Sequence, residues 1–126
     1  MAQRDFFPAR PDVTPQIYAY SDARYPGQLK VGYTSRDVRE RIAEQYPIKT
    51  PDEKLPYTIE YQESSVREDG TAFTDIPVHH WLVRQGFENT GGEWFRCTVN
   101  DVRAAIYALK SGEENRGIMI VMKKQL

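Results

Sequence analysis

The sequence predicts an α/β (α+β) fold, with a small mixed or antiparallel sheet of about three strands flanked by helices. Two strand-like segments joined by a Pro-Gly turn are followed directly by a helical segment. A further strand-like segment and two amphipathic helical segments come later in the chain. Eight Tyr, five Phe and two Trp supply side chains for a core. We therefore expect one domain that buries roughly two-thirds of its unfolded surface.

The predicted sheet begins with a hairpin. Residues 16–20 read Q-I-Y-A-Y, and this alternation places the isoleucine and the alanine on one face and Tyr18 and Tyr20 on the other. A Pro-Gly turn follows, and residues 29–33 read as the return strand.

The first predicted helix follows the hairpin at once. Ser35 or Arg36 lies near its start, and Asp37 lies in its first turn, where an acidic side chain is favourable. Helical spacing places three apolar or aromatic residues along one side: Val38, Ile42 and Tyr46.

The remaining elements are a strand and a helix, followed by a short strand and a third helix. Residues 57–61 read as the third strand. The second helix runs from near Asp75, its expected N-cap, to Gln85, and Gly86 ends it.

The last part of the predicted domain starts with residues 93–98, whose alternation indicates a short strand. Thr98 or Asn100 then caps the third helix, which ends at Gly112. Its apolar stripe consists of Val102, Ile106 and Leu109.

The expected organisation is an extended N-terminal arm at 1–14, the domain at 15–112, and a C-terminal strand or linker to a further domain at 113–126. No apolar run approaches ~18 residues, and no signal-peptide core is present at the N-terminus. A single cysteine, Cys97, suits a reducing compartment. We expect a soluble, cytoplasmic protein with no membrane partner.

Several motifs together resemble those of the GIY-YIG nuclease superfamily, most closely the phage- and restriction-associated branch in which the second motif reads K-I-G. The first family motif falls on residues 16–18 (Q-I-Y) and the second on residues 30–32 (K-V-G). The arginine of the family's first helix falls on Arg41, and its metal-binding glutamate, written E-W-F in this branch, falls on Glu93. His79 matches the branch's helix histidine. The resemblance covers roughly residues 15 to 112.

The resemblance implies a metal-dependent DNA endonuclease, from a restriction or phage-related system, that uses Mg²⁺ or Mn²⁺. Tyr18 would deprotonate water, Lys30 would tune that tyrosine, and Arg41 would hold the phosphate. His79 would relay a proton to the leaving group, and Glu93 would carry the metal. One departure is Lys30, which replaces the family's second tyrosine; the other is a glutamine in place of the first glycine.

Each candidate residue also has a structural interpretation. Tyr18 would pack in a half-buried sheet, and Lys30 would be a solvated lysine on an edge strand. Arg41 would pair with an aspartate four residues earlier. Glu93 would be a surface acid at a strand edge, and His79 a structural histidine.

Neither histidine has the spacing of a zinc site with Cys97, which reads as a small buried hydrophobe. The formal net charge of -1 gives no overall attraction to nucleic acid. We therefore expect weak DNA binding and a fused or associated targeting domain. The alternative function is an inactive GIY-YIG-like module that binds DNA or docks to a protein.

Overall fold

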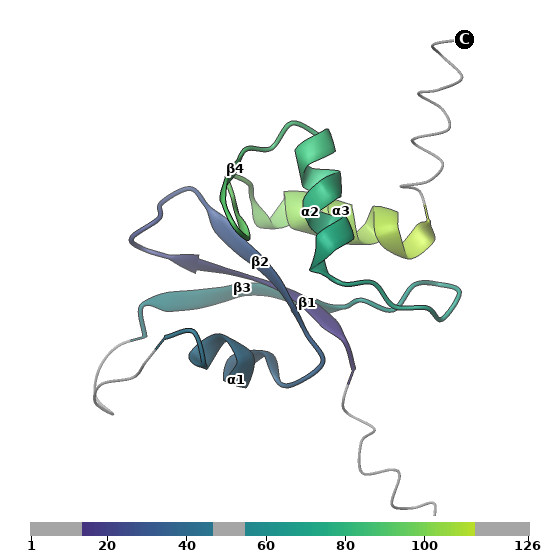
Figure 1. Ribbon diagram of the computed structural model, residues 1–126, viewed down its shortest axis with the longest axis horizontal. Coiled ribbons are helices and arrows are strands. Elements are labelled where there is room, and N and C mark those ends of the chain that lie inside the picture. The colour runs from purple at the N-terminus through teal and green to yellow at the C-terminus, as the bar shows by residue number, and fades with distance from the viewer. Residues whose placement is uncertain (1–13, 47–54, 113–126) are drawn as a thin grey trace, which may run out of the picture.

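The computed structural model describes residues 14–46 and 55–112 (Figure 1). The domain expected at 15–112 falls almost entirely within these residues. The predicted arm lies outside them except for its last residue, and the predicted C-terminal strand or linker at 113–126 lies outside them completely.

A five-stranded antiparallel sheet forms the centre of the fold, with the strand order β3-β1-β2-β5-β4. The strands are β1 (Gln16–Asp22), β2 (Leu29–Thr34), β3 (Tyr57–Ser64), β4 (Asn89–Gly91) and β5 (Trp94–Phe95). The prediction of about three strands was wrong because β4 and β5 are too short to show an alternating pattern. The strand expected at 93–98 is only the two-residue β5.

Three helices accompany the sheet: α1 (Val38–Ala43), α2 (Asp75–Arg84) and α3 (Val99–Ser111). The predicted start of α1 was two or three residues too early. Asp37 lies outside its first turn as the N-cap, where the carboxylate accepts a hydrogen bond from Arg39 N. Tyr46 lies beyond the end of α1 but still packs on the same side.

The caps of the other two helices are threonines. Thr74 caps α2, so the prediction of Asp75 as N-cap was wrong, and Asp75 is the first residue of the helix. Thr98 caps α3 in a reciprocal capping box with Asp101, which decides between the two predicted caps. Gly112 ends α3 in the left-handed conformation that glycine adopts readily, as predicted.

The helices lie on opposite faces of the sheet, with α1 on one side and α2 and α3 on the other (Figure 1). The predicted alternation of β1 is confirmed, because its even and odd residues enter different cores. The aliphatic core, against α2 and α3, includes Ile17, Ala19, Leu29, Val31, Val78, Leu82, Phe95, Val102, Ile106 and Leu109. The tyrosine core, against α1, consists of Tyr18, Tyr20, Val38, Ile42 and Tyr57.

A bulge in β3 places Tyr61 on the face opposite to that of Ile59. Tyr20 pairs with Ile59 and Ala19 pairs with Tyr61, so Glu60 is the extra residue. Ile59 packs against the tyrosine core, whereas Tyr61 packs against the aliphatic core. Without the bulge, Ile59 and Tyr61 would lie on the same face, because residues two positions apart in a regular strand do so.

None of the helices in the described part of the chain is both long enough and apolar enough to span a bilayer.

Candidate active site

Tyr18 lies directly over Gly32, its partner across the β1–β2 ladder. A Cβ added to Gly32 would lie 2.5 Å from Tyr18 Cζ and 2.8 Å from Tyr18 Cε1, well inside van der Waals contact. The ring of Tyr18 therefore occupies the space in which a side chain at position 32 would stand. This close approach is a physical reason for the glycine in the K-V-G motif.

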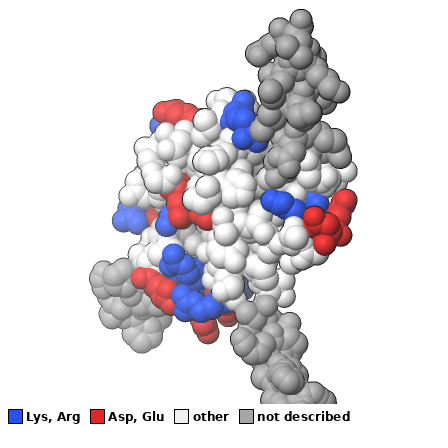
Figure 2. Space-filling view, turned by 45° about the vertical axis from the view of Figure 1, so that its right-hand side comes forward, with Lys and Arg blue, Asp and Glu red and all other residues white. Residues whose placement is uncertain are grey.

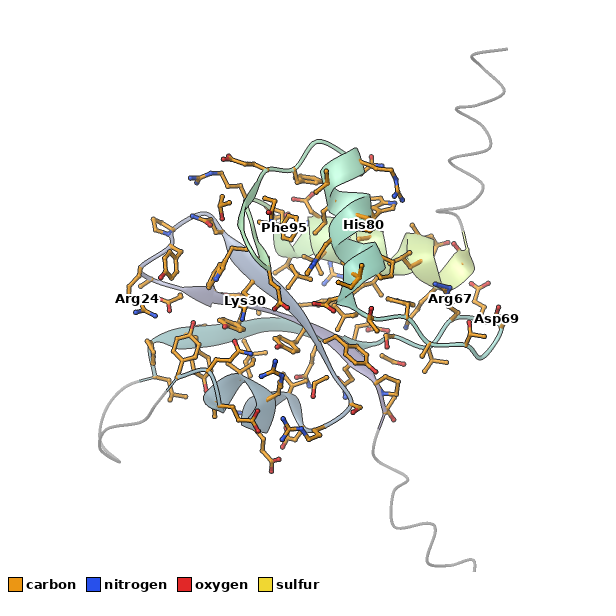
Figure 3. The ribbon with its side chains drawn as sticks, in the orientation of Figure 1. Arg24, Lys30, Arg67, Asp69, His80 and Phe95 are labelled. Carbon is orange, nitrogen blue, oxygen red and sulfur yellow. The ribbon has the colours of Figure 1, made fainter. Side chains whose placement is uncertain are left out.

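Lys30 joins two parts of the site. Its ammonium group donates a hydrogen bond to Gln45 Oε1 at 2.7 Å and lies 3.6 Å from Glu93 Oε1. It also lies 5.9 Å from the centre of the Tyr20 ring. The interpretation of Lys30 as an edge lysine was wrong, because β2 has a neighbouring strand on each side. Figure 3 shows this lysine over the sheet on the side of α1.

Gln45 follows α1 and was not predicted as a site residue. Its carboxamide oxygen accepts hydrogen bonds from Lys30 Nζ and, at 2.8 Å, from the Tyr20 hydroxyl. Its amide nitrogen donates to the Tyr18 hydroxyl at 3.4 Å. Gln45 therefore connects residues of β1 and β2 with the end of α1.

Glu93 lies in the tight turn between β4 and β5 rather than in a strand as predicted. Its main-chain carbonyl accepts a hydrogen bond from Val31 N at 2.9 Å, which fixes the turn to β2. Burial raises the pKa of the Glu93 carboxyl, while the positive charge of Lys30 opposes this effect. The charge of Asp75 and a hydrogen bond with it raise the pKa further. Glu93 thus belongs to a group of interacting charges, unlike an isolated surface acid.

Asp75 and His79 bring the start of α2 to the same place. They stand four residues apart on the helix, with 3.7 Å between His79 Nε2 and Asp75 Oδ2. From the sequence we expected Asp75 only to cap the helix. Its spacing of four residues from His79 was the available sign that the two side chains lie next to each other.

His79 is held against the end of the short strand β5. Its Nε2 lies 2.7 Å from the carbonyl oxygen of Val31, and because a carbonyl only accepts, Nε2 carries the proton. The ring also packs against Phe95, with 5.0 Å between ring centres. This hydrogen bond supplies a partner for the carbonyl of Val31, which lies beyond the start of β5. The adjacent His80 is exposed (Figure 3), so the two histidines point in different directions, as predicted.

Arg41 approaches the site from α1. Its Nη1 lies 3.7 Å from a carboxylate oxygen of Glu44, and its side chain is 36% exposed. The partial exposure leaves the guanidinium accessible to a ligand. The aspartate predicted to pair with it, Asp37, is engaged in capping the same helix.

The pKa of Tyr18 is raised, chiefly by burial. The hydrogen bond from Gln45 and the positive charge of Arg41 lower it, and the negative charges of Glu93 and Asp75 raise it. We expected Lys30 to be the tuning cation; the largest effect of any charge on Tyr18 is that of Arg41. Tyr18 therefore keeps its proton at neutral pH unless further positive charge arrives.

A continuous series of contacts thus links the predicted residues from the α1 side of the sheet to the start of α2. Contacts run from Tyr18 through Gln45 and Lys30 to Glu93, and from there to the start of α2 through Asp75. His79 completes this series of contacts, and Arg41 acts on it through its charge.

The donors suit a hard divalent cation better than zinc. Within residues 14–46 and 55–112, no group of three or more His, Cys, Asp or Glu side chains is arranged to hold a metal. Mg²⁺ requires fewer protein ligands, because one or two carboxylates suffice when water and phosphate complete its shell. Glu93, with Asp75 beside it, fits that description.

Burial raises the pKa of the Cys97 thiol to about 12, so this residue is unreactive.

Comparison with known proteins identifies the family. The model of the T5orf172 domain matches residues 16–110, which include every candidate site residue. No curated protein and no solved structure matches the chain. The T5orf172 family is associated with GIY-YIG-like and phage endonuclease-type domains, which points to a nuclease or DNA-binding role. The chain therefore belongs to the T5orf172 domain family.

Proposed function

We propose that the domain is a metal-dependent DNA endonuclease of the GIY-YIG type, which hydrolyses phosphodiester bonds with Mg²⁺ or Mn²⁺. The observation that carries the proposal is a series of contacts that joins a phenol, an ammonium group and a carboxylate. Gln45 bonds both Tyr18 and Lys30, and Lys30 pairs with Glu93. The family match is consistent with a restriction or phage-related system. DNA is the proposed partner, together with a fused or associated targeting domain.

The proposed reaction needs a base and stabilisation of negative charge at the phosphate. Tyr18 would act as the base in its phenolate form, after its hydroxyl has released its proton to solvent; the phenolate oxygen would then take a proton from water, and the water oxygen would bond to phosphorus as the bond from phosphorus to the leaving oxygen breaks. Arg41 binds a phosphate oxygen through its planar guanidinium. Glu93 would hold the divalent cation, which would supply positive charge to stabilise the transition state.

Lys30 and His79 have supporting roles in this proposal. Lys30 balances the charge of Glu93 and holds Gln45 in place. The Nε2 proton of His79 is engaged with the main chain of β2, so that contact positions α2 and with it Asp75. The transfer of a proton from His79 to the leaving group stays a prediction.

A domain that binds DNA without cutting it is the second candidate, and one observation favours it. Burial holds the pKa of Tyr18 above its ordinary value, which weakens Tyr18 as a base. The face shown in Figure 2 is mostly uncharged, with basic and acidic side chains in small separate groups, so this face offers no broad positive surface. Weak binding through a targeting partner suits both candidates.

A cleavage assay separates the two candidates. Supercoiled plasmid, linear duplex and single-stranded DNA are incubated with the domain in Mg²⁺, Mn²⁺ or EDTA. Tyr18→Phe removes only the phenolic oxygen and should lower cutting by roughly 10²–10⁴-fold while DNA binding persists. Glu93→Ala should abolish cutting in either metal. Arg41→Ala should weaken both binding and turnover, because the guanidinium acts on the phosphate before and during the reaction.

Matched controls lie away from the site. Tyr107→Phe removes a hydroxyl from an exposed tyrosine on α3, and Glu88→Ala removes an exposed acid that pairs with Arg96. Both should cut like the wild type. If the wild type binds DNA but leaves every substrate intact, the endonuclease proposal fails and the binding module replaces it.

A further inference from the structure

The carboxamide of Gln45 is the point at which the tyrosine core meets the candidate site. Its oxygen accepts from Lys30 Nζ at 2.7 Å and from the Tyr20 hydroxyl at 2.8 Å, and its nitrogen donates to the Tyr18 hydroxyl at 3.4 Å. These contacts join a residue beyond α1 to two neighbouring strands.

The orientation of this carboxamide is determined by its partners. A lysine ammonium group only donates, so the atom of Gln45 that faces Lys30 must be the oxygen. The nitrogen then faces Tyr18, and the phenolic oxygen receives an N–H at the position that it occupies over Gly32. Such hydrogen bonds are often long in the absence of substrate and shorten in the reacting complex.

We propose that Gln45 is a positioning residue for the endonuclease reaction, which holds the Tyr18 oxygen through a donated N–H and stabilises that oxygen when it loses its proton. The inference rests on the proposed function, in which Tyr18 is the base. An N–H donated to the oxygen favours the phenolate, because the anion accepts a stronger hydrogen bond than the phenol does.

Some of the charges around Tyr18 lower its pKa and others raise it. Arg41 favours the phenolate, whereas Glu93 and Asp75 disfavour it. Lys30 lies between Gln45 and Glu93 and is bound to both. The Gln45 N–H is a neutral donor that faces the phenol directly, so it adds to the effect of Arg41 without adding a charge.

A purely structural role is the competing explanation, since Gln45 also connects the end of α1 to the sheet. Gln45→Glu separates the two. The carboxylate has nearly the same shape and still accepts from Lys30 and Tyr20, so the connection is kept, but the donor to Tyr18 is lost. Gln45→Met is the neutral counterpart; it lacks the donor and adds no negative charge near DNA.

The first measurement is independent of cutting. Tyrosine ring carbons are labelled, the Tyr18 signal is assigned with Tyr18→Phe, and its titration is followed by NMR in the wild type, in Gln45→Met and in Gln45→Glu. The Tyr18 titration should move to higher pH in Gln45→Met, which removes the donor without adding a charge, and further in Gln45→Glu, where the new carboxylate also disfavours the phenolate. Gln45→Met therefore carries the test, and thermal unfolding shows whether each variant keeps the fold. An unchanged titration in a folded variant would overturn the inference.

The second measurement is cleavage as a function of pH. Both Gln45→Glu and Gln45→Met should lower kcat by roughly 10- to 100-fold, the range for groups that orient a reacting residue, and KM for DNA in Gln45→Met should stay near that of the wild type. The alkaline pH needed for full activity should rise in Gln45→Glu. Wild-type kcat in both variants would overturn the inference. A wild type that does not cut removes the proposed function instead, and the NMR titration still decides whether Gln45 donates to Tyr18.

Discussion

The two faces of the sheet are built from the same strands but have different chemistry. The aliphatic core contains Ile, Val, Leu and Phe side chains from the strands and from α2 and α3. The tyrosine core contains Tyr18, Tyr20 and Tyr57, and two of their hydroxyl groups meet the Gln45 carboxamide. Removing the polar group of a tyrosine changes little volume, whereas removing an aliphatic side chain leaves a cavity. We infer that the aliphatic core chiefly stabilises the fold and the tyrosine core positions reactive groups.

The largest expected effect on stability belongs to the aliphatic core. Leu82 is fully buried on α2, so Leu82→Ala should lower the free energy of unfolding by about 2–5 kcal/mol, as measured by urea denaturation. Its neighbour Val83 is 53% exposed, and Val83→Ala should stay within about 0.5 kcal/mol of the wild type. Equal losses in the two variants would contradict the assignment of Leu82 to the core.

Gly32→Ala tests the tyrosine core by adding a single methyl group. The new Cβ collides with the Tyr18 ring, so the ring must move, at a cost of about 1–3 kcal/mol in unfolding free energy. Cutting should fall more than this loss of stability explains, because the phenolic oxygen leaves its place beside Gln45.

A double-mutant cycle identifies the collision as the cause. Tyr18→Leu removes the ring from the space over Gly32, so Gly32→Ala should cost much less in that background. The coupling energy between the two sites should be about 0.5–3 kcal/mol. Additive losses would show that the methyl group acts elsewhere.

The smallest expected effect concerns acid sensitivity on the side of α1. Hydrogen bonds from the Arg24 side chain, aided by one from Tyr46, lower the pKa of Asp22 from 3.8 to about 2. Because the folded-state pKa lies below the ordinary value, this stabilisation is complete above about pH 4 and is lost as the pH falls towards 2. Exposure of Arg24 to water and salt keeps this contribution small.

Unfolding of wild type and Asp22→Asn at several pH values measures this contribution. The wild type should be the more stable protein at pH 6, and the difference should shrink steadily between pH 4 and 2. A difference independent of pH would mean that the carboxylate charge contributes nothing.

Local patterns in the sequence were sufficient to predict much of the fold. Alternation in residues 16–20 assigned the two faces of β1 correctly, since strand geometry fixes that choice residue by residue. Gly112 marked the end of α3, and Thr98 was one of two predicted caps at its start, because capping depends on a few neighbouring atoms. The hairpin and α1 were found in the right order for the same reason.

The remaining features depend on contacts between distant segments. β4 and β5 exist because they extend the edge of β2, and two or three residues carry no readable period. Gln45 stands in no motif, and its role is apparent only when β1, β2 and the end of α1 are placed together. Asp75 resembled a cap in sequence, but the fold turns it towards Glu93.

The bulge at Glu60 has a consequence for insertions and deletions. Tyr57 and Ile59, before it in β3, face the tyrosine core, and Tyr61 after it faces the aliphatic core. Glu60 therefore shifts the in–out alternation of β3 by one residue. The chemical identity of its side chain matters little, but its presence decides which face of the sheet every later residue of the strand occupies. We expect β3 to tolerate exchange of the side chain at position 60, and we expect deletion of the residue to turn Tyr61 towards α1 and to expose apolar surface beneath α3.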